Sequence, residues 1–213
     1  MPSPPDPNVT FRRAEAADAE PAVPLIYSSG PAAFDYVFSH DRPGAALAFL
    51  RFAFRDGRGE FGYRNHTVAV RDGGVVGVGA AWDGRAGLSF MAGAAAQILR
   101  FYGPLRCWGV IVRGLRVEHV IRQPTRAELY VAHLGVREEL RGQGVGERLI
   151  GELLQGADRS RHRVAALDVA VANPRAEALY ARLGFKVEAL RPANLRNRYH
   201  AVGDHRRMSL PLR

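Results

Sequence analysis

The chain has 213 residues, of which 47% are hydrophobic, and its formal net charge is +9. This length fits one domain, and the composition excludes disordered, fibrous and collagen-like proteins. The single cysteine, Cys107, excludes a disulfide framework and a cysteine-based zinc site. Because Cys107 lies in an apolar run, we expect a buried thiol, which is compatible with the cytoplasmic location that we predict.

The positive charge is carried almost entirely by arginine, since Lys186 is the only lysine. Arginine pairs well with phosphate, which suggests nucleic acid, but a GC-rich genome also favours arginine codons. The basic residues are spread along the chain, with no block of like charge and no interleaved aromatic and basic motif. We therefore do not expect a nucleic-acid partner.

Nothing in the sequence predicts an export signal or a membrane segment. The proline-rich residues 1–8 predict a disordered tail before a single domain of residues 9–213, and they lack the pattern of a secretory signal. The uncharged run 86–99 is shorter than the roughly 18–20 residues that cross a bilayer. We expect no contact with a membrane.

The first half of the chain predicts helices and a hairpin. In chain order these are a strand over residues 9–13, helices over 18–29 and 43–55, and a hairpin with strands 67–70 and 75–78. The apolar segment 86–117 follows, and we interpret it as one or two helices interrupted at Gly103-Pro104.

The second half of the chain alternates strands and helices. The pattern predicts strands over 128–136, 164–171 and 185–190, helices over 144–154 and 174–183, and a last strand through 208–210. This alternation is typical of an α/β fold.

A glycine-rich loop, Arg141-Gly142-Gln143-Gly144-Val145-Gly146, joins a predicted strand to a predicted helix. The amides at such a helix N-terminus point outward and the helix dipole is positive there, so this loop is suited to phosphate. It lacks the lysine of a nucleoside-triphosphate loop and the spacing of a dinucleotide-binding loop. The alternative is that its glycines only form a tight turn.

Two motifs follow one another in the chain: the first consists of Arg141, Gly144 and Gly146, and the second is Asn173-Pro174-Arg175-Ala176-Glu177-Ala178-Leu179-Tyr180 followed by Gly184-Phe185. Together they resemble the two signatures of the GNAT superfamily of N-acetyltransferases. The resemblance covers residues 120–190. It implies a mixed, splayed central β-sheet flanked by helices, here with a helical insertion, residues 86–117, before the cofactor-binding strand.

The same resemblance implies acetyl-CoA as cosubstrate and no metal. The pantetheine arm would contact the backbone of Leu134, Gly135 and Val136. The pyrophosphate would bind the amides of Gln143, Gly144, Val145 and Gly146, in a loop shaped by Arg141 and Gly142. Asn173 would hold the pantetheine arm; the alternative is that it serves only as a helix cap. Tyr180 would protonate the leaving thiolate; the alternative is that it is only a core residue.

The general base is open at this stage. By the period of two, Glu128 shares a face of its strand with Tyr130, Ala132, Leu134 and Val136, which makes it the first candidate. Its position is displaced by two residues from the usual glutamate of the family. The alternatives are Glu118, His119, His133, which faces the opposite side, or an ordered water.

The insertion and the acceptor leave further alternatives. Residues 86–117 either form a lid over the acceptor site or cover a face of the sheet or a dimer contact; the lid lining would be Phe90, Met91, Phe101, Tyr102 and Trp108. The function that the sequence predicts is acetyl transfer to a primary amine on a small molecule or peptide. The alternative is a non-catalytic CoA-binding sensor or interaction module, and a homodimer is compatible with either.

Overall fold

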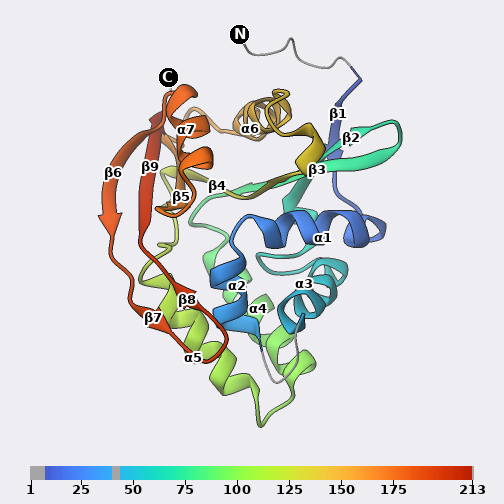
Figure 1. Ribbon diagram of the computed structural model, residues 1–213, viewed down its shortest axis with the longest axis vertical. Coiled ribbons are helices and arrows are strands. Elements are labelled where there is room, and N and C mark those ends of the chain that lie inside the picture. Colours follow the sequence, from blue (N-terminus) through green and yellow to red (C-terminus); the bar gives the residue numbers. More distant parts are fainter. Residues whose placement is uncertain (1–7, 40–43, 213) are drawn as a thin grey trace.

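The computed structural model describes residues 8–39 and 44–212, so the predicted tail, apart from Asn8, and Pro43 at a predicted helix start lie outside the described residues. Seven strands form one sheet in the order β1-β2-β3-β4-β5-β9-β6 (Figure 1). Their bounds are β1 Thr10–Arg13, β2 His66–Arg71, β3 Gly74–Trp82, β4 Glu128–Val136, β5 Val164–Ala170, β6 Lys186–Arg191 and β9 His205–Pro211. A separate short pair joins β7 Leu195–Arg196 to β8 Ala201–Val202.

The sheet has one parallel pair, β4 with β5, among the described residues, and it is short. It joins only Glu128 to Val164, Leu129 to Ala165 and Tyr130 to Ala166. Beyond these pairs β4 stays paired with β3, and β5 stays paired with β9. The two strands therefore diverge after Tyr130, and the sheet divides into two wings, β1–β4 and β5–β9–β6. This confirms the mixed, splayed sheet predicted from the sequence.

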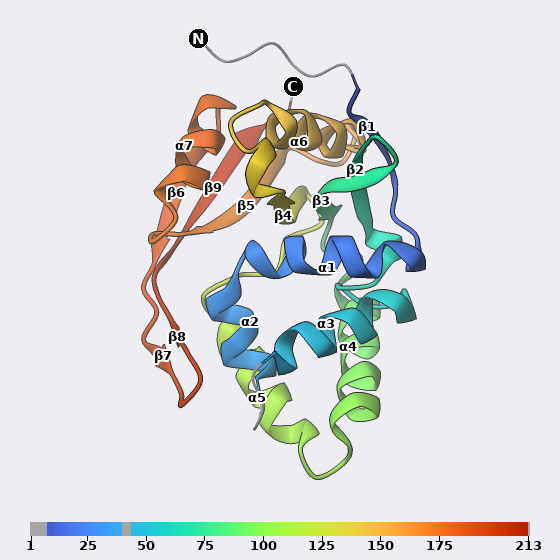
Figure 2. The same cartoon turned by 45° about the vertical axis from the view of Figure 1, so that its right-hand side comes forward.

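Helices cover both faces of the sheet (Figure 2). Hydrophobic side chains of α6 Val145–Gln155 and α7 Pro174–Arg182 pack on β4, β5 and β9. The other face carries a thicker helical layer that packs on β2 and β3. The helices of this layer are α1 Ala19–Ser28, α2 Pro31–Phe38, α3 Ala45–Asp56, α4 Gly87–Tyr102 and α5 Cys107–Glu118. Short 3-10 helices lie elsewhere in the chain, at Ala16–Asp18, Tyr63–Asn65 and Glu138–Leu140.

The predicted helical insertion is confirmed as two helices, α4 and α5, separated at Gly103, whose φ of 74° only glycine adopts easily. These helices pack mainly on α2 and α3, and Phe90 of α4 also contacts Trp82 of β3. Ile98 of α4 and Val110 of α5 enter the core of the helical layer, and the Cys107 thiol is buried there as expected. The insertion thus thickens an existing layer.

The sequence did not indicate α2 or the β7–β8 pair. In α2 the last residues, Tyr36, Val37 and Phe38, are all buried together with Phe34, so no polar face marks a helical period. The strands β7 and β8 have only two residues each, too few to show an alternation. None of the helices in the described ranges combines the length and the apolar character that crossing a membrane needs.

Candidate active site

A β-bulge lies in β4 just beyond the point where β4 and β5 separate. Ala80 of β3 pairs with Ala132, but Val78 pairs with Gly135, so Gly79 faces two residues, His133 and Leu134. His133 has a φ of 57°, a left-handed conformation that is rare for a residue with a side chain. Strained backbone conformations of this kind are concentrated at functional sites, so the bulge at His133 is a candidate functional position.

The bulge reverses the faces that the period of two predicted. Leu134 packs in the α6–α7 core, and Val136 contacts Val145 and Leu140 on the same side. His133 instead lies beside Trp82, with ring centroids 5.5 Å apart, and Trp82 in turn contacts Tyr130. The expectation that Leu134 and Val136 share the face of Tyr130, with His133 opposite, is therefore wrong. A prediction based on strict alternation of faces cannot detect an extra residue in a strand.

The glycine-rich loop leads from the end of β4 into α6, as its position in the sequence implied. Gly142 and Gly144 have φ values of 83° and 80°, and Gly144 is the N-cap residue of α6. The first backbone bond into the helix runs from Arg148 N–H to Gly144 O. The amides of Val145, Gly146 and Glu147 precede it and point out of the helix N-terminus, an arrangement that suits an anion.

Two members of the loop close its turn. The Arg141 Nε donates to the carbonyl of Val136 at 3.2 Å, and the Gln143 amide donates to the carbonyl of Leu140 at 3.3 Å. The Gln143 amide therefore already has a hydrogen-bond acceptor within the loop, whereas the amides of Val145 and Gly146 point outward. Arg175, which sequence reasoning did not single out, adds a cation, because its guanidinium lies 4.0 Å from where a Cβ on Gly142 would stand.

Asn173 and Tyr180 lie at the two ends of α7. The Asn173 Oδ1 accepts from the Ala176 amide at 3.1 Å, so the helix-cap role is present. Tyr180 is buried in the hydrophobic core that α6 and α7 form with β4, β5 and β9, where its ring lies beside Phe185. Burial raises the pKa of Tyr180 to about 12, so its phenol stays protonated at neutral pH. A phenol in this state still carries the proton that the predicted acid role of Tyr180 requires.

Glu128 is held in a buried network of charges. Its carboxylate accepts from the Thr125 amide at 2.6 Å and from Arg207 at 3.2 Å, and Arg207 also binds Asp168 at 2.8 Å. The Tyr130 hydroxyl donates to Asp168 at 3.0 Å, which ties β4 to β5 at their last pair. Burial alone would raise the pKa of Glu128, but the Thr125 amide and Arg207 hold it below its usual range.

His133 belongs to a second polar cluster that the sequence did not reveal. Its Nδ1 lies 3.1 Å from His66 Nε2, and its Nε2 lies 3.4 Å from Glu60 Oε1. Burial raises the pKa of Glu118, and nearby Glu60 raises it further, so both carboxylates lie in the same region. His119 is exposed, and its ring contacts the carbonyl of Leu115. Glu60 carries no motif signal, because it lies in an irregular loop.

The five aromatic and methionine side chains expected to line a lid do not gather at one place. Phe90 packs on Trp82, at 5.5 Å between ring centroids, and so lies over the Tyr130 face of β4. Phe101 and Tyr102 pack on Phe49 of α3, whereas Met91 and Trp108 are 60% and 70% exposed. Only Phe90 has the position that the lid hypothesis required.

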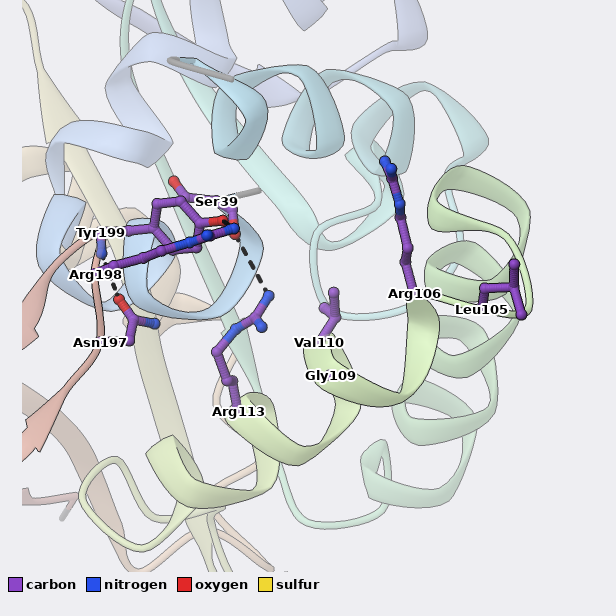
Figure 3. A pocket seen from close by; sticks show the side chains of 9 residues that line it. All are labelled: Ser39, Leu105, Arg106, Gly109, Val110, Arg113, Asn197, Arg198 and Tyr199. Atoms are coloured by element: carbon purple, nitrogen blue, oxygen red, sulfur yellow. Dashed lines mark hydrogen bonds between the residues drawn. The ribbon is translucent and has the colours of Figure 1, made fainter. Parts of the chain in front are cut away.

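A hollow of about 390 Å³ lies away from this region, between α5, the end of α2 and the β7–β8 pair (Figure 3). Arg106, Arg113 and Arg198 contribute to its lining. Arg113 donates to the carbonyls of Val37 and Ser39, at 2.9 and 3.4 Å, and so fastens α5 to the end of α2. No predicted site residue lines it. In the described ranges, no three potential metal ligands cluster together.

Comparison with known proteins agrees with this geometry. The sequence profile of the acetyltransferase (GNAT) family matches residues 31–185, well over half of the chain. The chain is also 38% identical over 74 residues to the 5-NmdU N-acetyltransferase of Pseudomonas phage PaMx11, which covers 34% of this chain and 51% of the relative. The chain thus spans about half the length of the curated relative that it matches.

Solved structures with the same fold are similar over nearly the whole chain. An N-acetyltransferase from Staphylococcus aureus Mu50 superposes with a TM-score of 0.69 at 16% identity, covering 94% of this chain and all of that one. A phosphinothricin acetyltransferase from Sinorhizobium meliloti, solved with acetyl-CoA, gives 0.55 at 21% identity, covering 96% and 89%. The fold and the divided sheet are those of an acetyltransferase. This chain belongs to the acetyltransferase (GNAT) family.

Proposed function

We propose that the protein transfers the acetyl group of acetyl-CoA to a primary amine by direct attack of the amine on the thioester. The observation that carries the proposal is the separation of β4 from β5 after Tyr130, with an anion-binding loop at the far end of β4. The pantetheine arm fits along the backbone of Leu134, Gly135 and Val136. The pyrophosphate fits the outward amides of Val145 and Gly146.

The reacting atoms then fall near the bulge at His133. Tyr180 is the acid that protonates the departing thiolate, because burial keeps its phenol protonated. Asn173 stands at the start of α7 and completes the cofactor site by holding the pantetheine arm. The phage relative is named for N-acetylation and the Sinorhizobium enzyme was solved with acetyl-CoA, which supports both the reaction class and the cosubstrate. The acceptor amine approaches the face of the sheet that carries Trp82 of β3 and Tyr130 of β4.

Calorimetric titration with acetyl-CoA and with CoA tests the proposal. A Gly144→Glu variant places a negative side chain, in a strained left-handed conformation, at the anion site. We expect wild-type protein to bind at one saturable site and this variant to lose binding. Gly151→Glu is the matched control, because Gly151 lies in the same helix with open space around it.

The outcomes separate the candidate functions. Equal binding by both variants, or no binding by folded wild-type protein, would contradict the cofactor assignment. Binding without acetylation of butylamine, 1,4-diaminobutane, benzylamine or a short peptide would favour the non-catalytic CoA-binding module.

A further inference from the structure

The ring of His133 occupies an aromatic cage at the bulge of β4. Its centroid lies 5.2 Å from those of Phe61 and His66 and 6.2 Å from that of Phe34. Only 8% of the residue is exposed. Both ring nitrogens nevertheless have polar neighbours, His66 on one side and Glu60 on the other. A polar chain therefore crosses the cage from β2 to the loop that carries Glu60.

The hydrogen bonds of this chain fix its protons. His66 Nδ1 lies 2.9 Å from the carbonyl of Gly62, which can only accept, so the proton of His66 is on Nδ1. Burial, and then the neighbouring His133, lower the pKa of His66 to about 3, so its Nε2 is unprotonated. That Nε2 accepts from His133 Nδ1–H. The Nε2 of a neutral His133 is then left bare, facing the Glu60 carboxylate.

A bare imidazole nitrogen and a carboxylate are both acceptors, so the space between them has room for one proton. Glu60 is the accessible member of the pair, with 28% of its side chain exposed against 7% for His133. The charged and titratable groups that face the pair are His66 from β2, Glu118 at the end of α5 and Tyr130 from β4. The two acidic ones, Glu60 and Glu118, favour the approach of a cation such as an ammonium group.

We propose that Glu60, backed by His133, is the general base of the acetyl transfer, and that His66 is a positioning residue that sets the tautomer of His133. The inference rests on the proposed function. The amine nitrogen forms its bond to the acetyl carbon and gives a proton to the Glu60–His133 pair. The C–S bond breaks, the thiolate takes the proton of Tyr180, and solvent returns the pair's proton to Tyr180.

The other candidates are placed less well for this step. Both oxygens of Glu128 are bound, to the Thr125 amide and to Arg207, and Glu128 precedes the divergence of the strands. His119 is exposed and contacts its own helix through Leu115. Glu118 has a pKa raised by burial and by Glu60, and it is the competing base that the experiment includes.

The test compares Glu60→Gln with Glu118→Gln, using Glu152→Gln on α6 as the matched control, with butylamine or whichever amine of the panel is acetylated. We expect Glu60→Gln to lower kcat about 10²- to 10⁴-fold, the usual contribution of a general base. Glu60→Asp should recover part of the rate, and acetyl-CoA affinity should stay unchanged in every variant.

An equally large loss of kcat confined to Glu118→Gln, or an unchanged kcat in Glu60→Gln with normal acetyl-CoA binding, would overturn this inference and leave the proposed function standing. Absence of acetyl-CoA binding by the wild-type protein would overturn both. A measurement on unmodified protein is independent of activity. Long-range ¹H–¹⁵N spectra of labelled histidine should show His66 and His133 both protonated at Nδ1, and a His66 proton at Nε2 would contradict the relay.

Discussion

The two buried tyrosines, Tyr130 and Tyr180, differ in the hydrogen bonding of their hydroxyl groups. Tyr130 donates its hydroxyl to Asp168, whose carboxylate also binds Arg207, so its proton is part of a fixed network. Among the described residues none forms a hydrogen bond with the Tyr180 hydroxyl, and burial raises the pKa of that group to about 12. A phenol that is protonated and unengaged can give its proton to a leaving group, whereas Tyr130 serves to join β4 to β5.

Replacing Tyr180 by phenylalanine removes only the hydroxyl and keeps the ring beside Phe185. We expect kcat to fall about 10²-fold or more, since a positioned acid contributes this much, with acetyl-CoA affinity unchanged. Steady-state kinetics combined with calorimetry measures both quantities. An unaltered kcat would make Tyr180 a core residue only.

His66 makes the stability of the protein depend on pH. The pKa of His66 falls from about 6.5 in the unfolded chain to about 3 in the folded protein. Below pH 6.5, the unfolded chain therefore binds a proton at His66 that the folded protein does not bind. Stability is therefore lost as the pH falls from 6.5 towards 3. His205, whose pKa is also lowered by burial, acts in the same direction.

Between pH 7 and pH 5 we expect His66 to cost about 2 kcal/mol of unfolding free energy. Urea unfolding at the two pH values measures it. His119→Gln, at an exposed position, should show the same loss as wild type, and a wild-type stability that is flat over this interval would contradict the neutral, buried His66.

At the scale of elements, the insertion of α4 and α5 is part of the core. Gln97 of α4 is buried and donates to the carbonyls of Ala53 and Arg58, at 3.4 and 2.8 Å, so α4 is fastened to the end of α3. In α5, Val110 is almost fully buried against the helical layer. Removal of the two helices would expose this apolar surface to water.

We therefore expect a chain lacking residues 86–117 to be insoluble or unfolded, rather than folded with a changed preference among amines. Solubility and circular dichroism decide between these outcomes. The conservative control is Trp108→Gln, which alters a 70% exposed side chain of α5 and should leave the unfolding free energy within about 0.5 kcal/mol. A soluble, folded deletion variant with a changed preference among amines would instead support the lid interpretation.

The sequence predicted elements better than it predicted the surroundings of side chains. Local patterns sufficed for β4, α6 and α7, because alternation, helical period and glycine positions are properties of short segments. The bulge at His133 depends on its pairing with β3, so the faces assigned beyond Ala132 were wrong. Glu60 meets His133 only through the fold, and no spacing in the chain announces that contact.

The predicted cofactor residues show the same division. The turn at Gly142 and Gly144 is a local feature, and its left-handed geometry is present. The helix cap at Asn173, an alternative that the sequence indicated, is present as well. The hydrogen bond from the Gln143 amide to the Leu140 carbonyl depends on the folded backbone, so the sequence does not indicate it. The individual binding and catalytic roles stay predictions until the variants are measured.

At the scale of the whole molecule, the two wings of the sheet are joined by three residue pairs and by the network of Glu128, Arg207, Asp168 and Tyr130. The end of β4 at Val136 lies six residues beyond the last pair, about 20 Å along an extended strand. A rotation of about 5° at this junction would move that end by about 2 Å, a shift comparable to a hydrogen-bond length. The few contacts at this junction therefore set how far apart the ends of β4 and β5 stand.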